Sequence, residues 1–266
     1  MIRFDAYSAT TLAANRYQLA DLFGPDLTVK EGRGFHQFGH RASFSDDSGT
    51  EVGAVLWGGA QGDRTMIEVK GERTPEVVER LRSAFPHRVT RVDSCADFDA
   101  PKAFQTLLRP VLAVKKQHRI WGERRGDWSQ PDKGRTMTLG AKSSPTTFRL
   151  YEKGKQPEYL HLARPDWVRA EVQVRPQKDA KHDYAALPPS EVWGASRWSR
   201  DLAAQILKDH VDPHPAGSVY RRTDLEARID WLCRQGGPTL VELAAQLGSW
   251  ECVGLTLRDR IAELRK

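Results

Sequence analysis

The sequence predicts an α+β fold, in which an antiparallel-rich sheet carries helices on one face and leaves its other face open and polar. Two observations lead to this prediction. Between residues 35 and 175, runs of alternating apolar and polar residues outnumber helical runs, and alternation is the pattern of half-buried strands. Only two amphipathic helices interrupt these runs, too few to cover both faces of so many strands.

The first third of the chain predicts a helix, a group of strands and a second helix. Residues 8–23 (SATTLAANRYQLADLF) place apolar side chains at helical spacing after a Ser/Thr start, which predicts one helix. From 35 to 70, the runs HRASFSDD, EVGAVLWGG and RTMIEVKG are separated by Asp, Gly and Ser and predict antiparallel strands. Residues 74–85 (TPEVVERLRSAF) predict a helix with Thr74 as its cap.

The middle and the end of the chain differ in character. The run HRVTRVDSCADFD (87–99) predicts a strand, and a long helix follows from Pro101 to about His118, which Pro110 can kink. TMTLGA, TTFRLYEKG and WVRAEVQVR predict three further strands. The tail is helical in PSEVWGASRWSRDLAAQIL, TDLEARIDWLCRQGG, TLVELAAQLG and LTLRDRIAELRK. We therefore expect one domain over residues 1–185, with a core at about 52–175, and a helical region over 186–266.

Composition narrows the class of protein. The chain has 266 residues, with 39% hydrophobic and 29% charged residues, which is typical of a globular protein. It has no run of eighteen apolar residues and no signal-peptide pattern at its start, so we expect a cytoplasmic protein without a membrane partner. The three cysteines are widely spaced, which favours reduced thiols. A net charge of +6 favours a polyanionic partner such as nucleic acid, although many basic proteins bind none.

Strand alternation indicates which side chains occupy the open face. In WVRAEVQVR the valines and the alanine point to one side, and Arg169 and Glu171 point to the other. In FRLYEKGK the apolar residues face the helices, which leaves Arg149, Tyr151 and Lys153 on the polar side. The same argument, applied to two more strands, gives the acidic and tyrosine side chains of one polar face: Glu68, Asp93, Asp97, Tyr151 and Glu171.

Two interpretations of this polar face remain open. Carboxylates on adjacent strands repel one another, and an oxygen-ligated Mg²⁺ or Mn²⁺ would relieve that repulsion. Alternatively, each carboxylate pairs with a neighbouring Arg or Lys. Tyr151 lies between Arg149 and Lys153, and these cations are expected to lower the pKa of its phenol. A metal and an activated tyrosine are the parts that phosphoryl transfer to tyrosine requires.

Several motifs at coherent spacing resemble a known family. TRVD, TLGAKSS followed by RLYEKGK, and VRAEVQ, with MIEVKG as a looser match, are similar to the replication initiation factor (Rep-trans) family over residues 52–175. Its members start rolling-circle replication of filamentous phages and small plasmids. The resemblance implies a divergent HUH/RRM-like nickase core. The His-hydrophobic-His metal motif of related initiators is absent, because FHQFGH places His36 and His40 four residues apart.

The resemblance also implies roles for individual residues. Tyr151 occupies the place of the nucleophile, which nicks one DNA strand and remains attached through a 5′-phosphotyrosine. The carboxylates that would bind the divalent metal, Mg²⁺ or Mn²⁺, are Asp93 and Glu171 first and Glu68 next, with Asp97 a weaker candidate. Arg149 and Lys153 would offset charge on the phosphorus. The freed 3′-hydroxyl would prime a polymerase, so a host helicase and polymerase are expected partners beside the DNA.

Sequence-specific DNA binding is expected outside this cluster. The segment 115–135 (KKQHRIWGERRGDWSQPDKGR) is rich in cations and glycine and could form a mobile DNA-binding arm or a solvated loop. The paired helices of the tail faintly resemble a helix-turn-helix, although a packed bundle has the same pattern. The residues expected to contact DNA are Lys115, Lys116, Arg124, Arg125 and Arg169.

Two other functions are consistent with the same residues. A relaxase-like mobilisation protein of an integrative element would share the nicking chemistry. A non-catalytic DNA-binding protein on the same scaffold would retain the basic surface and would need no tyrosine adduct. No Gly-rich phosphate loop occurs, since LWGGAQGD lacks the required Lys-Ser/Thr ending. A nucleotide cofactor is therefore not expected.

Overall fold

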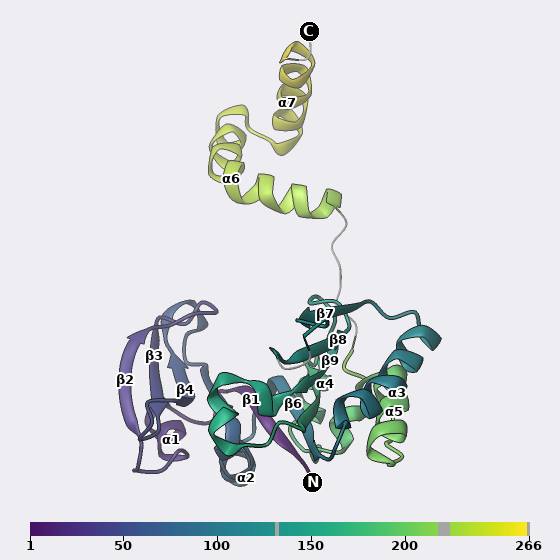
Figure 1. Cartoon of the computed structure of the whole chain (residues 1–266). Coiled ribbons are helices and arrows are strands. Elements are labelled where there is room, and N and C mark those ends of the chain that lie inside the picture. The colour runs from purple at the N-terminus through teal and green to yellow at the C-terminus, as the bar shows by residue number, and fades with distance from the viewer. Residues whose placement is uncertain (131–132, 218–223, 265–266) are drawn as a thin grey trace. The chain divides into compact units, whose positions relative to one another are not determined.

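A ten-stranded antiparallel sheet forms the centre of the fold (Figure 1). The computed structural model describes residues 1–130, 133–217 and 224–264, and these residues divide into two units, Met1–Val219 and Tyr220–Lys266. The sheet belongs to the first unit, in the order β2-β3-β4-β5-β1-β6-β10-β9-β8-β7. Its strands are β1 Ile2–Thr11, β2 Thr28–Arg33, β3 His40–Ser45, β4 Glu51–Trp57, β5 Thr65–Lys70, β6 Arg88–Asp99, β7 Gly122–Gly126, β8 Arg135–Leu139, β9 Thr146–Glu152 and β10 Trp167–Val174.

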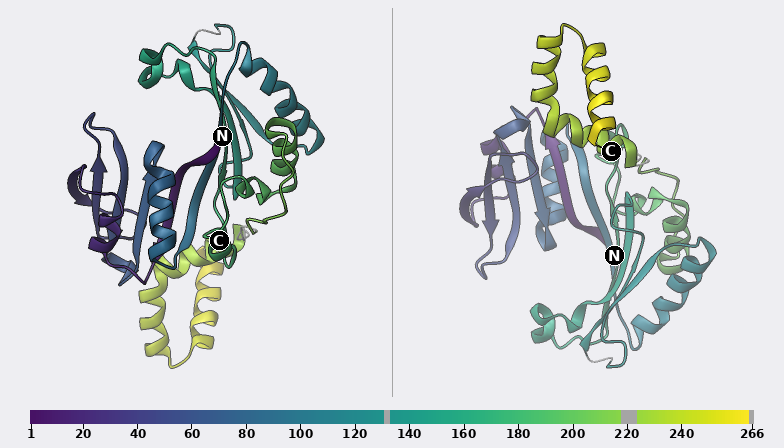
Figure 2. Two further views of the ribbon diagram at one scale, coloured as in Figure 1. Left: turned by 90° about the horizontal axis from the view of Figure 1, so that it is seen from below. Right: turned by 90° about the horizontal axis from the view of Figure 1, so that it is seen from above.

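Helices cover one face of this sheet (Figure 2). Phe23 at the end of α1 stacks on Phe44 of β3 with ring centroids 4.4 Å apart, and Trp193 packs edge-on against Phe148 of β9 at 5.9 Å. These residues belong to one hydrophobic core that packs beneath the sheet strands other than the two edge strands β2 and β7. The helices of this unit are α1 Arg16–Asp21, α2 Thr74–Ala84, α3 Ala103–Gln117, α4 Ala180–Asp183 and α5 Arg197–Leu202. The predicted α+β fold with helices on one face is confirmed.

Short helical turns complete the first unit. The 3₁₀ turns are η1 Gly59–Gln61, η2 Gly71–Arg73, η4 Lys153–Lys155, η5 Pro157–Leu162 and η6 Glu191–Ala195, and η7 Ala203–Leu207 is a π-helical turn. On the open face, a small apolar cluster of Phe38, Ala54, Leu56 and Met66 lies near β4 and β5. Most of the remaining side chains that β9 and β10 place on this face are polar or charged.

The prediction of one helix over residues 8–23 was wrong for its first residues. Residues 8–11, expected to begin a helix, are the end of β1, and helix α1 starts only at Arg16 after a cap by the Asn15 side chain. Strand β1 pairs with β5 on one side and β6 on the other, and these long-range pairings override the local helical pattern. Thr74 does not cap α2, because its hydroxyl donates to the backbone oxygen of Asp5.

Strand β7 and the C-terminal helices also differ from expectation. Residues 122–126, expected in a mobile arm or loop, form an edge strand paired with β8. In the second unit, α6 (Asp224–Leu247) passes through Gly236, Gly237 and Pro238, where a break was expected, and it bends in mid-course as a proline requires (Figure 1). A turn at Gly248, with φ of 81°, leads into α7 (Trp250–Leu264).

The first unit extends beyond the boundary expected at residue 185. Trp193 and Leu202 are fully buried in its core, so the segment up to about residue 217 belongs with the sheet rather than with the helical tail. None of the helices within the described ranges combines the length and the apolar character needed to cross a membrane.

A buried ion-pair cluster joins the three central strands on the open face. Arg169 of β10 is 0% exposed, and its Nε and one terminal nitrogen each donate to Asp97 of β6 at 2.7 Å. Its other terminal nitrogen pairs with Asp5 of β1. Asp5 reaches this position because a β-bulge interrupts the β1–β6 register between Phe4 and Ala6, and bulges redirect side chains.

Removing this central cation should destabilise the first unit. Arg169→Ala would leave two carboxylates without their main partner, and the loss of one member of a buried pair costs about 3 kcal/mol. Lys70→Ala, at an exposed pair with Glu51, is the matched control and should cost less than about 1 kcal/mol. Urea unfolding measures both values. Equal costs for the two variants would mean that the cluster does not hold β1, β6 and β10 together.

Candidate active site on the open face

The strand register places most of the expected site residues in adjacent rows. Tyr151 of β9 lies opposite Arg169 of β10, and Arg149 lies opposite Glu171. On the other side of β10, Gln173 lies opposite Asp93 of β6. Strand alternation therefore gathers Arg149, Tyr151, Glu171 and Asp93 within neighbouring rows of one face.

Tyr151 makes direct contact with Glu171. The phenol hydroxyl donates a hydrogen bond to Glu171 Oε2 at 3.2 Å. Arg149 forms an ion pair with the other carboxylate oxygen. Glu171 is only 1% exposed, whereas Tyr151 is half-buried and Arg149 is exposed. The carboxylate thus lies beneath the tyrosine and the arginine, with one oxygen for each.

Asp93 is buried beside this group and has its own partners. It is 1% exposed, receives a hydrogen bond from Arg91 Nε at 2.9 Å, and receives another from the Gln173 amide at 3.1 Å. Burial and the charge of Asp93 raise the pKa of Glu171, while Arg149 acts in the opposite direction. The interpretation that each carboxylate pairs with a neighbouring cation describes both Asp93 and Glu171 in this structure.

The phenol of Tyr151 is not activated in this state. Burial, and then the negative charge of Glu171, raise its pKa well above the usual value, and the cations Arg169 and Arg149 offset this only in part. The expectation that flanking cations lower this pKa was wrong, because desolvation and the contact with a carboxylate outweigh them.

Lys153 approaches the site from a different element than expected. Strand β9 ends at Glu152, and Lys153 begins the turn η4. Its ammonium lies 4.5 Å from the ring centroid of Tyr159 and 5.1 Å from that of Trp167, and burial lowers its pKa. Lys153 still lines the same cavity as Tyr151, a space of about 700 Å³ that also takes in Asp5, Asp93 and Arg149.

Glu68 lies apart from this cavity. It belongs to β5 and faces Ser8 of β1, which in turn faces Arg91 of β6. Glu68 is therefore two strand spacings, about 10 Å, from the row of β6, and it lines a neighbouring cavity instead. Burial raises its pKa.

The donor set suits an ion that is shared with the substrate. Across the described ranges, no group of three or more His, Cys, Asp or Glu side chains could hold a metal on its own. Mg²⁺, however, is commonly held by one or two carboxylates together with substrate phosphates. Both carboxylates of the pair Asp93 and Glu171 are buried, and Asp93 is close enough to raise the pKa of Glu171, so their oxygens fit such an ion.

The residues expected to contact DNA are divided between the two faces. Arg125 of β7 lies opposite Thr136, which lies opposite Tyr151, so it shares a row of the open face with the tyrosine. Arg124 points to the other side, over the ring of Trp128 at 4.6 Å, and Trp128 packs on Phe104 of the core. Lys115 and Lys116 lie in the last turn of α3, in the helical layer.

Arg169 does not fit its expected role in DNA contact. Its side chain is fully buried by Asp97 and Asp5, so no phosphate can reach it in this structure. Asp97, which was the weaker metal candidate, is engaged in the ion pair with Arg169. Alternation in the sequence predicts the face on which a side chain lies but not how deeply it is buried. It also could not predict that Asp5 points to the open face, because the β-bulge sets the direction of that side chain.

Comparisons with known proteins agree with this architecture. The profile of the family Rep_trans, described as replication initiation factor, matches residues 88–246, more than half of the chain. Among solved structures, the rolling circle replication initiator protein from Geobacillus stearothermophilus is similar, with a TM-score of 0.50 and 18% identity over 73% of this chain and 83% of that chain. A search of curated proteins gave no match.

The structural likeness is one of fold, because the sequence identity is low, whereas the family match rests on the sequence itself. The family match spans β6, β9 and β10, the strands that carry Asp93, Tyr151 and Glu171. The chain therefore belongs to the replication initiation factor family, and its sheet has the fold of a rolling-circle replication initiator.

Proposed function

We propose that this protein initiates rolling-circle DNA replication by nicking one strand of its origin with Tyr151 as the nucleophile. The observation that carries the proposal is the hydrogen bond from the Tyr151 hydroxyl to the buried carboxylate of Glu171. Among the tyrosines of the described residues, Tyr7 and Tyr184 are buried in the core, and Tyr17 bonds with Arg16. Tyr151 combines access to a cavity with a base at its hydroxyl.

The reaction joins the phenol oxygen to the scissile phosphorus. As the new bond forms, the bond from phosphorus to the 3′-oxygen breaks, and the phenol proton passes to Glu171. The leaving 3′-oxygen takes a proton from Lys153, whose lowered pKa favours its release. The products are a 5′-phosphotyrosine and a free 3′-hydroxyl, which can prime a polymerase. The phosphotyrosine conserves the phosphodiester energy, so the reverse attack rejoins strands without ATP.

Charge at the phosphorus is balanced by cations from strand β9 and from the turn η4. Arg149 is exposed at the rim of the cavity, where its guanidinium can contact non-bridging phosphate oxygens. Lys153 adds a second positive charge from η4. Asp93 and Glu171 would hold Mg²⁺ or Mn²⁺ together with phosphate oxygens, and the ion would polarise the phosphate. Rolling-circle initiators generally use such a metal.

The proposed substrate is single-stranded or extruded origin DNA, and the proposed partners are a host helicase and polymerase. A relaxase-like mobilisation protein would use the same chemistry on another DNA site. A non-catalytic DNA-binding protein would form no covalent adduct, so adduct formation separates it from the enzyme.

The first prediction concerns the nucleophile. Tyr151→Phe removes only the hydroxyl, so the protein should fold, bind a single-stranded oligonucleotide with nearly unchanged affinity, and form no covalent adduct. Incubation with labelled oligonucleotide and Mn²⁺, followed by SDS gel electrophoresis, measures the adduct. Tyr159→Phe is the matched control, because Tyr159 lines the same cavity and packs on Trp167, and within the described part of the chain no carboxylate accepts a hydrogen bond from its hydroxyl. This variant should form the adduct. An active Tyr151→Phe protein would exclude Tyr151 as nucleophile.

The second prediction concerns the metal. Asp93→Asn and Glu171→Gln keep side-chain shape but remove the anionic oxygens, so each should weaken Mn²⁺ binding by more than about tenfold and should abolish cleavage. Electron paramagnetic resonance of Mn²⁺, with an uncleavable oligonucleotide present, measures binding independently of activity. Glu68→Gln, in the neighbouring cavity, is the control and should bind Mn²⁺ nearly as the parent does. Unchanged Mn²⁺ affinity in both site variants would contradict the assignment.

The third prediction separates two adjacent arginines. Arg125→Gln should reduce the slope of log affinity against log salt by about 0.7 for single-stranded DNA, because Arg125 shares the face of Tyr151. Arg124→Gln has the same charge change on the opposite face and should leave the slope unchanged. Fluorescence anisotropy at several salt concentrations measures both. Equal slopes for the two variants would mean that DNA does not extend over β7.

A further inference from the structure

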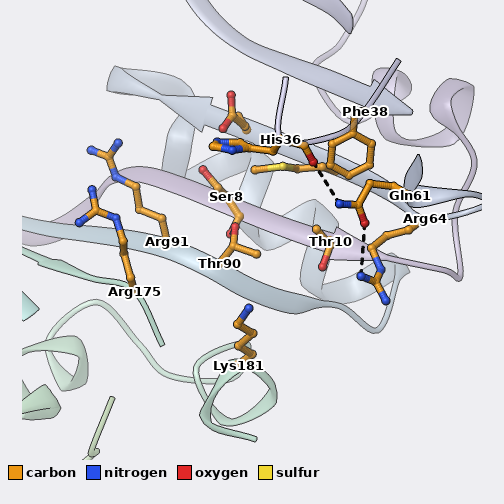
Figure 3. Close-up of a pocket in the computed structure, with 12 residues that line it drawn as sticks. Ser8, Thr10, His36, Phe38, Gln61, Arg64, Thr90, Arg91, Arg175 and Lys181 are labelled. Carbon is orange, nitrogen blue, oxygen red and sulfur yellow. Dashed lines mark hydrogen bonds between the residues drawn. The ribbon is translucent and has the colours of Figure 1, made fainter. Parts of the chain in front are cut away.

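A second cavity lies on the open face beside the proposed active site (Figure 3). Its volume is about 470 Å³, within the range of sites that bind small molecules, about 300–1,000 Å³. Its floor is made by hydroxyl-bearing residues of the two central strands, Ser8 and Thr10 of β1 and Thr90 of β6. Figure 3 shows cationic side chains arranged around this floor, from β6, from the end of β10, from α4 and from the loop before β5.

Several of these cations have no anionic partner. Arg175 and Lys181 form no ion pair or side-chain hydrogen bond within the described part of the chain. Arg64 makes only a long hydrogen bond, 3.5 Å, to the Gln61 amide. Burial and then the charge of Arg91 lower the pKa of Arg175, and burial, Arg88 and Arg64 lower that of Lys181. Neighbouring cations therefore disfavour the charged forms of Arg175 and Lys181, although Asp93 partly offsets this at Arg175, and a bound anion would relieve that repulsion.

The remaining wall of the cavity differs in chemistry. Phe38 and Met66, from the small apolar cluster of the open face, line one side. The single carboxylate among the lining residues, Glu68, interacts with His36, Arg41 and Arg91, and Figure 3 shows His36 across the cavity floor from Lys181. A ligand that combines an anionic group with a flat, partly apolar group bearing N–H donors would match both walls. A nucleotide unit has this combination.

The cavity adjoins the proposed active site and shares one lining residue with it. Arg91 lines both cavities, and its guanidinium bonds with Asp93. Tyr151 lies in the row of Arg169 and Asp97, whereas Ser8 lies in the row of Arg91, three strands away and six residues along the strands. At the usual spacings this corresponds to about 14 Å across the sheet and about 20 Å along it. A DNA strand whose scissile phosphate contacts Tyr151 can therefore reach the second cavity several nucleotides away.

We infer that this cavity binds one nucleotide of the substrate strand, several nucleotides from the scissile phosphate, with its phosphate between Arg175 and Lys181 and its base toward Phe38 and Met66. This inference rests on the proposed function for its substrate, and it adds a site that positions the strand. A free nucleotide offers the same phosphate chemistry, so the experiment has to separate the two sources.

The test measures DNA binding without cleavage. In a Tyr151→Phe background, Arg175→Gln combined with Lys181→Gln should reduce the slope of log affinity against log salt by about 0.7, the value for one neutralised phosphate on a single strand. The control pair, Arg109→Gln with Lys208→Gln, removes two exposed cations of the helical layer and should leave the slope unchanged. Fluorescence anisotropy of a labelled oligonucleotide gives the slopes, and circular dichroism checks that each variant folds.

Two results would overturn the inference. A slope equal to that of the parent, in the folded variant, would show that the cavity carries no DNA phosphate. The second result uses a free deoxynucleoside triphosphate as competitor, at a concentration equal to that of nucleotides in the oligonucleotide. If it displaces the labelled strand from the parent but not from the Arg175 and Lys181 variant, the cavity is a site for a free nucleotide instead. Failure of the proposed function gives a different result. In that case the protein with Tyr151 intact forms no covalent adduct, independently of the salt slope for DNA binding.

Discussion

Two buried charges on one strand hold the open face in its arrangement. Arg169 and Glu171 of β10 are both almost completely buried, although they belong to the polar side of the sheet. Arg169 links β10 to β6 and β1 through ion pairs with Asp97 and Asp5. Glu171 links β10 to β9 through an ion pair with Arg149 and a hydrogen bond from Tyr151. A buried charge is costly unless it is paired and hydrogen-bonded, so these partners fix the position of the tyrosine hydroxyl.

The same pairing explains how the site can remain quiet without DNA. The hydrogen bond to a buried carboxylate keeps Tyr151 protonated, since burial and Glu171 both raise the phenol pKa. On the proposed mechanism, a phosphate entering the cavity competes with Glu171 for the exposed guanidinium of Arg149. The carboxylate oxygen that Arg149 releases would then be free to help hold the divalent ion together with the phosphate.

Much of this arrangement follows from the sequence, and its limits have physical causes. Period-two alternation in β6, β9 and β10 predicted that Asp93, Tyr151 and Glu171 share one face, because pleat geometry alone decides sides. It did not predict depth, so Arg169 was expected at the surface, whereas Asp97 and Asp5 enclose it. The β1 strand was missed because its pairing is long-range, and Asp5 was missed because a bulge sets its direction. Lys153 was placed on a strand that ends one residue earlier.

The central claim is that Tyr151 becomes the covalent attachment point of the DNA. The most direct test is to trap the adduct with a single-stranded oligonucleotide pool and Mn²⁺, digest the protein, and identify the DNA-linked peptide by mass spectrometry. The account predicts a 5′-phosphotyrosine within the peptide that contains Tyr151, next to Glu152 and Lys153 in the sequence. A phosphotyrosine at Tyr159 or at any other tyrosine would contradict it.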